Sequence, residues 1–205
     1  MESFIEIYKV PHSVCDKFVR IFHHNEHLTE PGESMTEDGP IKDGPKKSTE
    51  LTLSLEHLQK ITPFWNTFRN SIENYCTKHI GLDMYQNTVM FEQTNLQHYA
   101  PSEGFFNSHC ERSIDSFFPL SHRLLVFMLY LTDTPNAGTC FPRQKIITEC
   151  TKGDLIIWPA GFTHPHYGII TDEHEKMILT GWVHRLIENN MDVKDETLEE
   201  DEETL

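Results

Sequence analysis

Residues 123–132 read RLLVFMLYLT, with eight consecutive apolar side chains between an arginine and a threonine. The run is far too short to span a bilayer, and the turn-forming residues TPNAG follow at 134–138. A short apolar run that ends at a turn signal is typical of a β-strand in a protein core. This stretch therefore predicts a core β-strand.

Similar runs occupy most of the chain that follows residue 87. They cover residues 88–99, 145–150, 154–158, 165–170 and 176–184. Between them lie turn signals such as APSEG, TKGD and PAGF. Several short strands at even spacing predict a β-sandwich or a jelly roll.

The first part of the chain begins with a strand-like segment and a helix. Residues 3–10 alternate apolar and polar side chains, which predicts a strand. A helix is expected from about Val14 to His23, with Ser13 as its N-cap and Asp16 as the acidic partner in a capping box.

A long loop and a second helical region follow. Residues 29–47 contain three glycines and three prolines and almost no apolar side chains, so we expect a loop, either a lid over the substrate or a disordered surface segment. Residues 55–80 have helical periodicity, and Pro63 either kinks this helix or begins another one. The predicted class is α+β with a mainly β core and N-terminal supporting helices.

The chain has 205 residues and a formal net charge of −15, from 32 acidic against 17 basic side chains. Such a charge disfavours binding to nucleic acid and to anionic membranes. Residues 191–205 hold eight acids and one lysine, which predicts a solvated acidic tail. The rest, residues 1–190, is expected to be one domain, with a helical part over 1–85 and a jelly-roll core over 86–186.

The five cysteines form no CxxC pair, and the N-terminal sequence MESFIEIYKV does not resemble a signal peptide. Reduced thiols in the cytoplasm, or in a host's cytoplasm if the protein is viral, are therefore expected.

A candidate metal motif lies between two of the predicted strands. In a strand, residues i and i+2 point to the same face, so His109 and Glu111 would present an imidazole and a carboxylate side by side. A third ligand is available from the segment FTHPHYG, 162–168. Two histidines and one carboxylate form the facial triad of non-haem Fe(II) oxygenases, which leaves metal positions open. Alone, however, the pair His-x-Glu is common by chance, and the ordinary interpretation is a pair of surface residues.

Four segments in a fixed order make the pattern specific. They are LQHYAPSEGFFNSHCE (96–111), LLVFMLYLTDTPNAGTCFP (124–142), TKGDLIIWPAGFTHPHYG (151–168) and EKMILTGWV (175–183). Over about 90 residues they resemble the Fe(II)/2-oxoglutarate-dependent dioxygenases, closest to the prolyl 4-hydroxylase-like group with its phage and microbial members. The resemblance implies a double-stranded β-helix, which is a form of jelly roll.

The resemblance implies that His109, Glu111 and His166 are the catalytic metal ligands. Glu111 departs from the family pattern, in which aspartate is commoner. His164 shares a face with His166 in a regular strand and stays an alternative distal ligand, and Asp115 is a fallback carboxylate without the i+2 geometry.

The resemblance also implies a co-substrate pocket. Lys176, ten residues after His166, would pair with the distal carboxylate of 2-oxoglutarate, where many relatives have arginine. Tyr130 would add a hydrogen bond to that carboxylate, and Tyr99 would lie near the metal. Thr180 and Trp182 share the face of Lys176 and would form the pocket wall. Without the resemblance, Lys176 would be interpreted as a solvated lysine and the aromatic residues as core residues.

The function implied is hydroxylation of an unactivated C–H bond with Fe(II), 2-oxoglutarate and dioxygen, and with ascorbate as an accessory reductant. The substrate is expected to be a peptide, with a prolyl residue as the first choice, or a small molecule; a modified base stays open. The protein would be a monomer or a homodimer. The alternatives are a non-catalytic jelly-roll binding module and a cupin-like metalloprotein that does not depend on 2-oxoglutarate.

Overall fold

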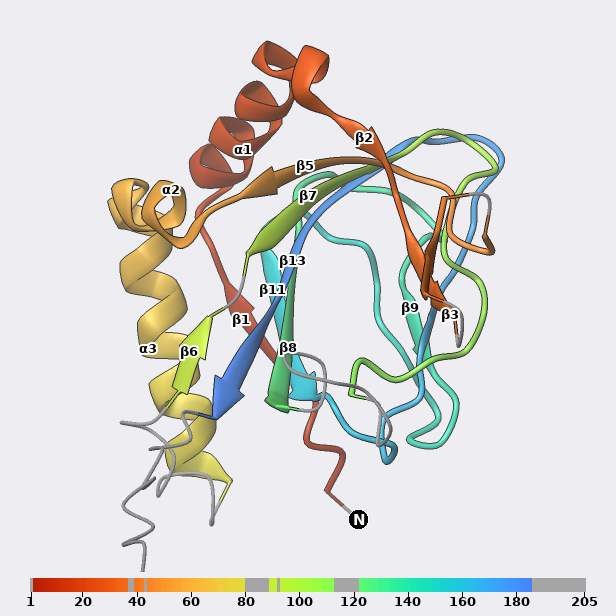
Figure 1. Ribbon diagram of the computed structural model, residues 1–205. Helices are drawn as coiled ribbons and strands as arrows, with labels where there is room; N and C mark the ends of the chain where they lie inside the picture. Colours follow the sequence, from red (N-terminus) through yellow and green to blue (C-terminus); the bar gives the residue numbers. More distant parts are fainter. Residues whose placement is uncertain are drawn as a thin grey trace, which may run out of the picture.

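The computed structural model describes residues 2–36, 39–42, 44–79, 89–91, 93–112 and 122–185. A large antiparallel sheet crosses the molecule (Figure 1). In spatial order its strands are β1 (Glu6–Lys9), β11 (Asp154–Pro159), β8 (Arg123–Tyr130), β13 (Lys176–Arg185), β7 (Thr94–Tyr99), β5 (Thr49–Leu53) and β2 (Glu30–Pro31). A further strand, β6 (Val89–Phe91), pairs with the C-terminal part of β13. The predicted mainly β architecture is confirmed.

The run RLLVFMLYLT forms β8, the strand between β11 and β13. Leu125, Phe127 and Leu129 belong to the core cluster on one face of the sheet. Val126 and Tyr130 belong to a second cluster on the other face. Alternate side chains of a strand point to opposite faces, so a strand that is buried on both faces needs apolar residues at nearly every position. This explains the continuous apolar run.

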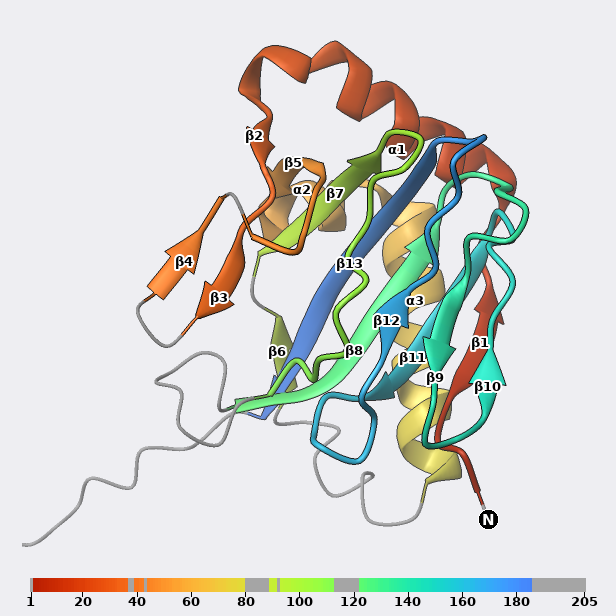
Figure 2. The ribbon, with the colours of Figure 1, turned by 90° about the vertical axis from the view of Figure 1, so that its right-hand side faces the viewer.

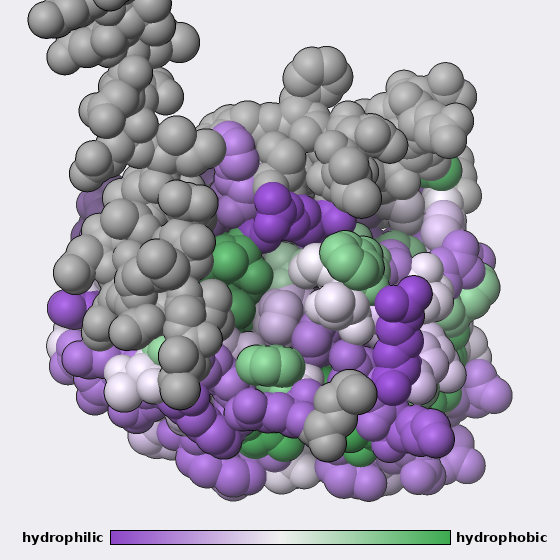
Figure 3. All heavy atoms as spheres, turned by 90° about the horizontal axis from the view of Figure 1, so that it is seen from below, coloured by the Kyte–Doolittle hydropathy of each residue, from purple (hydrophilic) through white to green (hydrophobic). Residues whose placement is uncertain are grey.

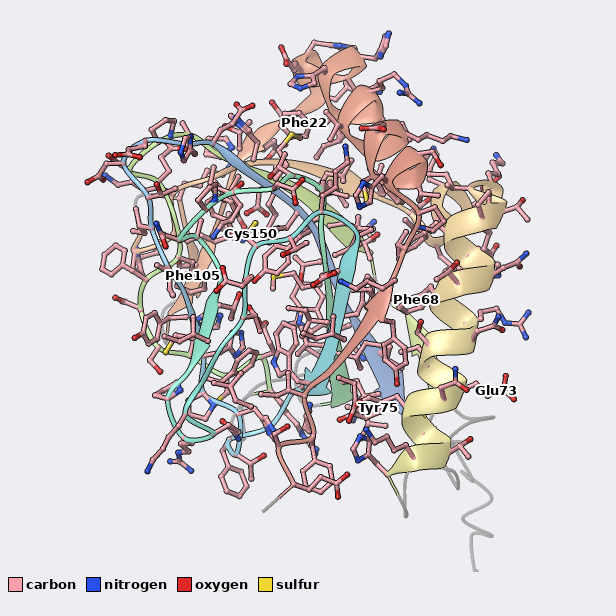
Figure 4. All side chains as sticks on the ribbon, turned by 180° about the vertical axis from the view of Figure 1, so that it is seen from behind. Phe22, Phe68, Glu73, Tyr75, Phe105 and Cys150 are labelled. Atoms are coloured by element: carbon pink, nitrogen blue, oxygen red, sulfur yellow. The ribbon has the colours of Figure 1, made fainter. Side chains whose placement is uncertain are left out.

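Three helices cover one face of the large sheet. They are α1 (His12–His24), α2 (Leu55–Lys60) and α3 (Thr62–Lys78). Figure 4 shows Phe68 and Tyr75 pointing from α3 toward the sheet, while Glu73 points away from it. The Phe68 ring packs 4.6 Å from the ring of Phe127 on β8, and the Tyr75 hydroxyl donates a hydrogen bond to the carbonyl of Phe4.

We expect Phe68→Ala to destabilise the fold by about 3–5 kcal/mol, because it leaves a cavity at a position that is 1 % exposed. Chemical denaturation of the variant measures this free energy of unfolding. Glu73→Ala, on the exposed side of the same helix, is the control and should change the free energy by less than about 0.5 kcal/mol. Equal losses in both variants would contradict this account of the core.

A small sheet lies over the opposite face of the large one (Figure 2). Its strands are β10 (Ile146–Ile147), β9 (Thr139–Phe141) and β12 (Tyr167–Gly168), in that spatial order. Phe141 of β9 packs with Trp158 of β11 at a ring distance of 5.3 Å, so apolar side chains fill part of the space between the two sheets. Of the candidate site residues, His166 directly precedes β12 of this small sheet, whereas those on β7, β8 and β13 belong to the large sheet.

Several local predictions need correction. Helix α1 begins at His12 and Pro11 occupies the N-cap position, so Ser13 is not the N-cap and forms no capping box with Asp16. Pro11 itself has a non-helical ψ of 137°, and the helical conformation starts with the next residue. Of the two alternatives for Pro63, the start of a second helix is confirmed: α3 begins at Thr62, and Pro63 lies in its first turn.

The segment 29–47 is not a plain loop. It contains β2, which pairs with β5, and a hairpin of β3 (Ser34–Thr36) and β4 (Gly39–Ile41). Strands β5 and β9 were also missed, and β5 places part of the supposedly helical half of the chain in the large sheet. Pairing with neighbouring strands stabilises such segments, and local sequence does not reveal it.

The surface of the described part shows no extended apolar area on the face seen from below, where hydrophilic and hydrophobic residues are interspersed (Figure 3). Among the described helices, none has both the length and the apolar character that crossing a membrane requires. The predicted acidic tail, 191–205, and the last residues of the predicted domain lie outside the described residues.

Candidate active site

His109, Glu111 and His166 come together beside the small sheet. His109 and His166 exchange two backbone hydrogen bonds, each 3.0 Å long, in an isolated antiparallel bridge. This bridge sets the two imidazoles side by side, with ring centroids 4.5 Å apart. Glu111 follows two residues after His109, and the ligand atoms of the three side chains all lie within 4.8 Å of one another. Within the described residues, no other group of three potential ligands meets this criterion.

Hydrogen bonds to carbonyls orient both imidazoles. The Nδ1 atom of His109 lies 2.8 Å from the carbonyl oxygen of Asn107, and Nδ1 of His166 lies 3.0 Å from that of His164. A carbonyl only accepts, so each Nδ1 carries the proton and donates it. When a ring is neutral, its lone pair is therefore on Nε2, the atom that faces Glu111. This is the arrangement of metal-binding histidines, in which an outer partner fixes the tautomer.

His164 points away from this group. Its Nε2 lies 2.8 Å from the carbonyl oxygen of Ser3, and its Nδ1 lies 2.9 Å from the Thr163 hydroxyl. Nε2 must therefore donate to Ser3, while Nδ1 accepts from Thr163. Burial lowers the pKa of His164, which favours this neutral form. With both nitrogens in use, the geometry favours His166 over His164 as the distal ligand.

Glu111 contributes one oxygen to the space between the imidazoles. Its Oε1 lies 3.4 Å from Nε2 of His109 and 3.4 Å from Nε2 of His166. Burial alone would raise the pKa of Glu111, but the hydrogen bonds and charges of the two histidines outweigh it and hold that pKa well below its usual range. Burial likewise opposes protonation of His109, and Glu111 raises the pKa of His109 in spite of it. The carboxylate is thus ionised, as a metal ligand must be.

Arg123 is a site residue that sequence reasoning missed. Its Nη1 lies 3.3 Å from Oε2 of Glu111, and the indole Nε1 of Trp182 donates to the same oxygen at 3.0 Å. The sequence did contain a signal for this role, namely the charged side chain at the start of an apolar strand. A buried arginine needs a polar partner. Arg123 is 9 % exposed.

Lys176 is buried on the sheet face that carries Trp182. Residues Lys176, Thr180 and Trp182 alternate along β13 and so point to one face. The Lys176 Nζ donates to the carbonyls of Ala137, at 3.2 Å, and of Ile169, at 3.4 Å; Ile169 lies three residues after His166. Burial lowers the pKa of Lys176. A lysine that is 7 % exposed excludes the interpretation as a solvated side chain.

Tyr99 and Tyr130 lie on either side of Lys176. Tyr99 is the β7 residue that pairs with Lys176, whose Nζ is 5.1 Å from the centroid of the Tyr99 ring. The Tyr99 hydroxyl donates to Gln97 at 2.6 Å. Tyr130 pairs with Ile178, two residues beyond Lys176. Both tyrosines are buried, and burial raises the pKa of each, so both stay protonated.

The Tyr130 hydroxyl lies between two threonine hydroxyls, those of Thr139 at 2.8 Å and Thr148 at 2.9 Å. It therefore has polar partners before any ligand binds. Thr180 donates to the carbonyl of Phe127 at 3.2 Å, so its hydroxyl is used by the sheet. The fallback carboxylate, Asp115, lies outside the described residues.

Comparison with known proteins gives a match in structure only. No protein-family model matches the sequence, and no curated protein matches it either. Among solved structures, the viral collagen prolyl hydroxylase vCPH from Paramecium bursaria Chlorella virus-1, in its 2OG complex, is similar with a TM-score of 0.67. The match has 16 % identity and covers 90 % of this chain and 97 % of that one.

Two further prolyl hydroxylases have similar folds. The Pseudomonas putida prolyl-4-hydroxylase matches with a TM-score of 0.63 and 15 % identity, over 88 % of this chain and 92 % of that one. A Trichoplax adhaerens prolyl hydroxylase, solved with a peptide fragment of the hypoxia inducible factor oxygen degradation domain, matches with a TM-score of 0.62 and 10 % identity, over 88 % and 83 %. The chain thus has the double-stranded β-helix fold of the prolyl 4-hydroxylase-like 2-oxoglutarate oxygenases.

Proposed function

We propose that this protein is an Fe(II)- and 2-oxoglutarate-dependent hydroxylase. The observation that carries the proposal is the convergence of two imidazoles and one carboxylate, from His109, His166 and Glu111, whose ligand atoms lie within 4.8 Å of one another. Three protein ligands of this kind suit Fe(II) and leave coordination positions for a co-substrate and dioxygen. The buried Lys176 nearby supplies the cation that a dicarboxylic co-substrate needs.

The chain's own residues have distinct roles in this proposal. His109, Glu111 and His166 hold Fe(II) through Nε2, Oε1 and Nε2. Lys176 pairs with the distal carboxylate of 2-oxoglutarate, and the ammonium gives up weak carbonyl contacts for an anionic partner.

Other side chains complete the co-substrate pocket. The Tyr130 hydroxyl donates a hydrogen bond to the same distal carboxylate. It still accepts a hydrogen bond from one of the two neighbouring threonine hydroxyls. Tyr99, Thr180 and Trp182 line the space between that carboxylate and the metal.

Bound Fe(II) supplies the activation of dioxygen. One oxygen atom enters the substrate as a hydroxyl group, the other enters succinate, and 2-oxoglutarate is oxidised with loss of carbon dioxide. The protein binds and orients both substrates and excludes water. Ascorbate serves as a reductant that keeps the iron in the Fe(II) state.

For the substrate we propose a prolyl residue in a peptide, because the three structural neighbours described above are prolyl hydroxylases and one of them was solved with a peptide. We further propose that residues 1–190 form one domain, followed by an acidic tail, and that the protein acts in the cytoplasm, a host's if it is viral, as a monomer or a homodimer. The described cysteines are all free, which fits a reducing compartment.

An anaerobic titration tests the function. Metal-free protein receives Fe(II) and then 2-oxoglutarate, and the visible charge-transfer band of a chelated keto acid is followed. We expect a band that needs both additions and disappears in His109→Ala. Metal binding without a band would favour the cupin-like metalloprotein, and neither metal binding nor a band in folded protein would favour the binding module. With the band established, proline-containing peptides are assayed first for succinate formation.

A further inference from the structure

The two carboxylate oxygens of Glu111 have different surroundings. Oε1 of Glu111 faces the imidazoles, whereas Oε2 receives hydrogen bonds from the Trp182 indole at 3.0 Å and from Arg123 at 3.3 Å. The same Arg123 Nη1 also lies 3.2 Å from the main-chain carbonyl oxygen of Glu111. Arg123 thus contacts both ends of the glutamate and restricts its rotamer.

Arg123 and Trp182 also contact each other. The guanidinium carbon lies 3.5 Å from the centroid of the Trp182 ring, which is a close cation–π stack. The two residues come from neighbouring strands, β8 and β13, where the pairing register shifts between Val183 and His184. Such irregularities re-aim side chains. The stack holds both donors in place before a metal binds.

A glutamate at this position needs such support. It has one more rotatable bond than aspartate, and ordering an additional bond opposes metal binding. Glu111 lies just after an isolated bridge rather than inside a regular strand, and the next backbone N–H, that of Arg112, donates to the Ala160 carbonyl at 3.0 Å. The backbone of Glu111 is therefore held on both sides, and the side chain is the part that still needs positioning.

We infer that Arg123 and Trp182 form a clamp that positions Glu111 so that only Oε1 is offered to the metal. They are positioning residues, since neither would touch the metal. This inference rests on the proposed role of Glu111 as a ligand, and it assigns a function to an arginine near a cation site. Through the clamp, the carboxylate binds through one oxygen, and further coordination positions stay free for a co-substrate.

Two substitutions test the clamp without changing the charge of the protein. Trp182→Phe removes the indole donor but keeps an aromatic ring, and Arg123→Lys keeps the cation but cannot form the same planar stack and paired contacts. Because charge is kept, a change in metal affinity reports on the orientation of Glu111 and not on repulsion between Arg123 and the metal.

The measurement is the Kd of Co(II), followed by its visible absorption in anaerobic, metal-free full-length protein. We expect each variant to bind Co(II) about 10- to 100-fold more weakly, the usual effect of losing an outer-sphere partner. Trp65→Phe, in helix α3 on the opposite side of the large sheet, is the matched control and should keep the wild-type Kd. Circular dichroism confirms folding, and if one variant fails to fold, the other still tests whether its own residue positions Glu111.

A Kd within twofold of wild type in both folded variants would overturn the clamp. Weaker Co(II) binding in only one folded variant would show that Arg123 and Trp182 do not act together and would leave a single positioning residue. The proposed function is judged separately by 2-oxoglutarate: wild-type protein that binds Co(II) tightly but gives no Fe(II)–keto acid band refutes the oxygenase while the clamp stands. Conversely, a normal band together with unaffected variants refutes only the clamp.

Discussion

Replacing His166 with alanine is expected to abolish retention of Fe(II), whereas replacing His164 with alanine is expected to leave it intact. The two histidines are separated by one residue and are equally buried, at 5 % and 4 % exposed, so burial does not distinguish them. Their hydrogen bonds do, because Nε2 of His166 lies 3.4 Å from Oε1 of Glu111, while His164 uses both of its nitrogens on Ser3 and Thr163.

The size of the effect follows from the number of ligands. Loss of an outer partner costs about 10- to 100-fold in metal affinity, and loss of one of three direct ligands should exceed that. Metal content after gel filtration, and the Kd of Fe(II) measured under anaerobic conditions, give the result. His164→Ala should instead lower thermal stability, since the Ser3 carbonyl loses its donor, a change of about 1–3 kcal/mol. The reverse pattern of metal loss would show that His164 is the distal ligand.

Lys176→Ala is expected to raise the Kd of 2-oxoglutarate roughly 100-fold and to leave Fe(II) binding unchanged. Deleting one member of a buried charge pair costs about 2–5 kcal/mol, because the other charge stays buried without a partner. Lys176 makes no hydrogen bond to His109, Glu111 or His166, so the metal ligands are expected to be unaffected. The visible band of the Fe(II)–keto acid complex, followed while Fe(II) or 2-oxoglutarate is titrated, measures the binding of each. An unchanged Kd for 2-oxoglutarate would remove Lys176 from the co-substrate pocket.

The same lysine predicts a dependence on pH. Burial lowers the pKa of Lys176 below its ordinary value of 10.5, so the free protein loses this charge at a less alkaline pH than a solvated lysine would. Below the lowered pKa the ammonium is present and binding is at its strongest; above it the Kd of 2-oxoglutarate rises with pH. Lys176→Arg is the control, because arginine stays charged and should remove the rise. A pH-independent Kd in the wild type would contradict this assignment.

Much of the architecture could be predicted from local sequence. The run 123–132 became β8, and residues 176–184 correspond to β13. These predictions succeeded because the side-chain pattern of a strand records which of its faces are buried. The short strands β5 and β9 were missed, because their stability comes from pairing partners rather than from their own composition.

The candidate site divides in the same way. Residue identity and spacing were enough to predict the donor types: an imidazole and a carboxylate two residues apart, and a lysine at the start of a strand. The sequence favoured His166 over His164 only through the resemblance and the ten-residue spacing to Lys176, and it gave no role to Arg123. The tertiary structure separates the two histidines and places Arg123 beside Glu111, because both features depend on hydrogen bonds to Ser3 and Glu111, which are distant in the chain from their partners and meet them only in the folded protein.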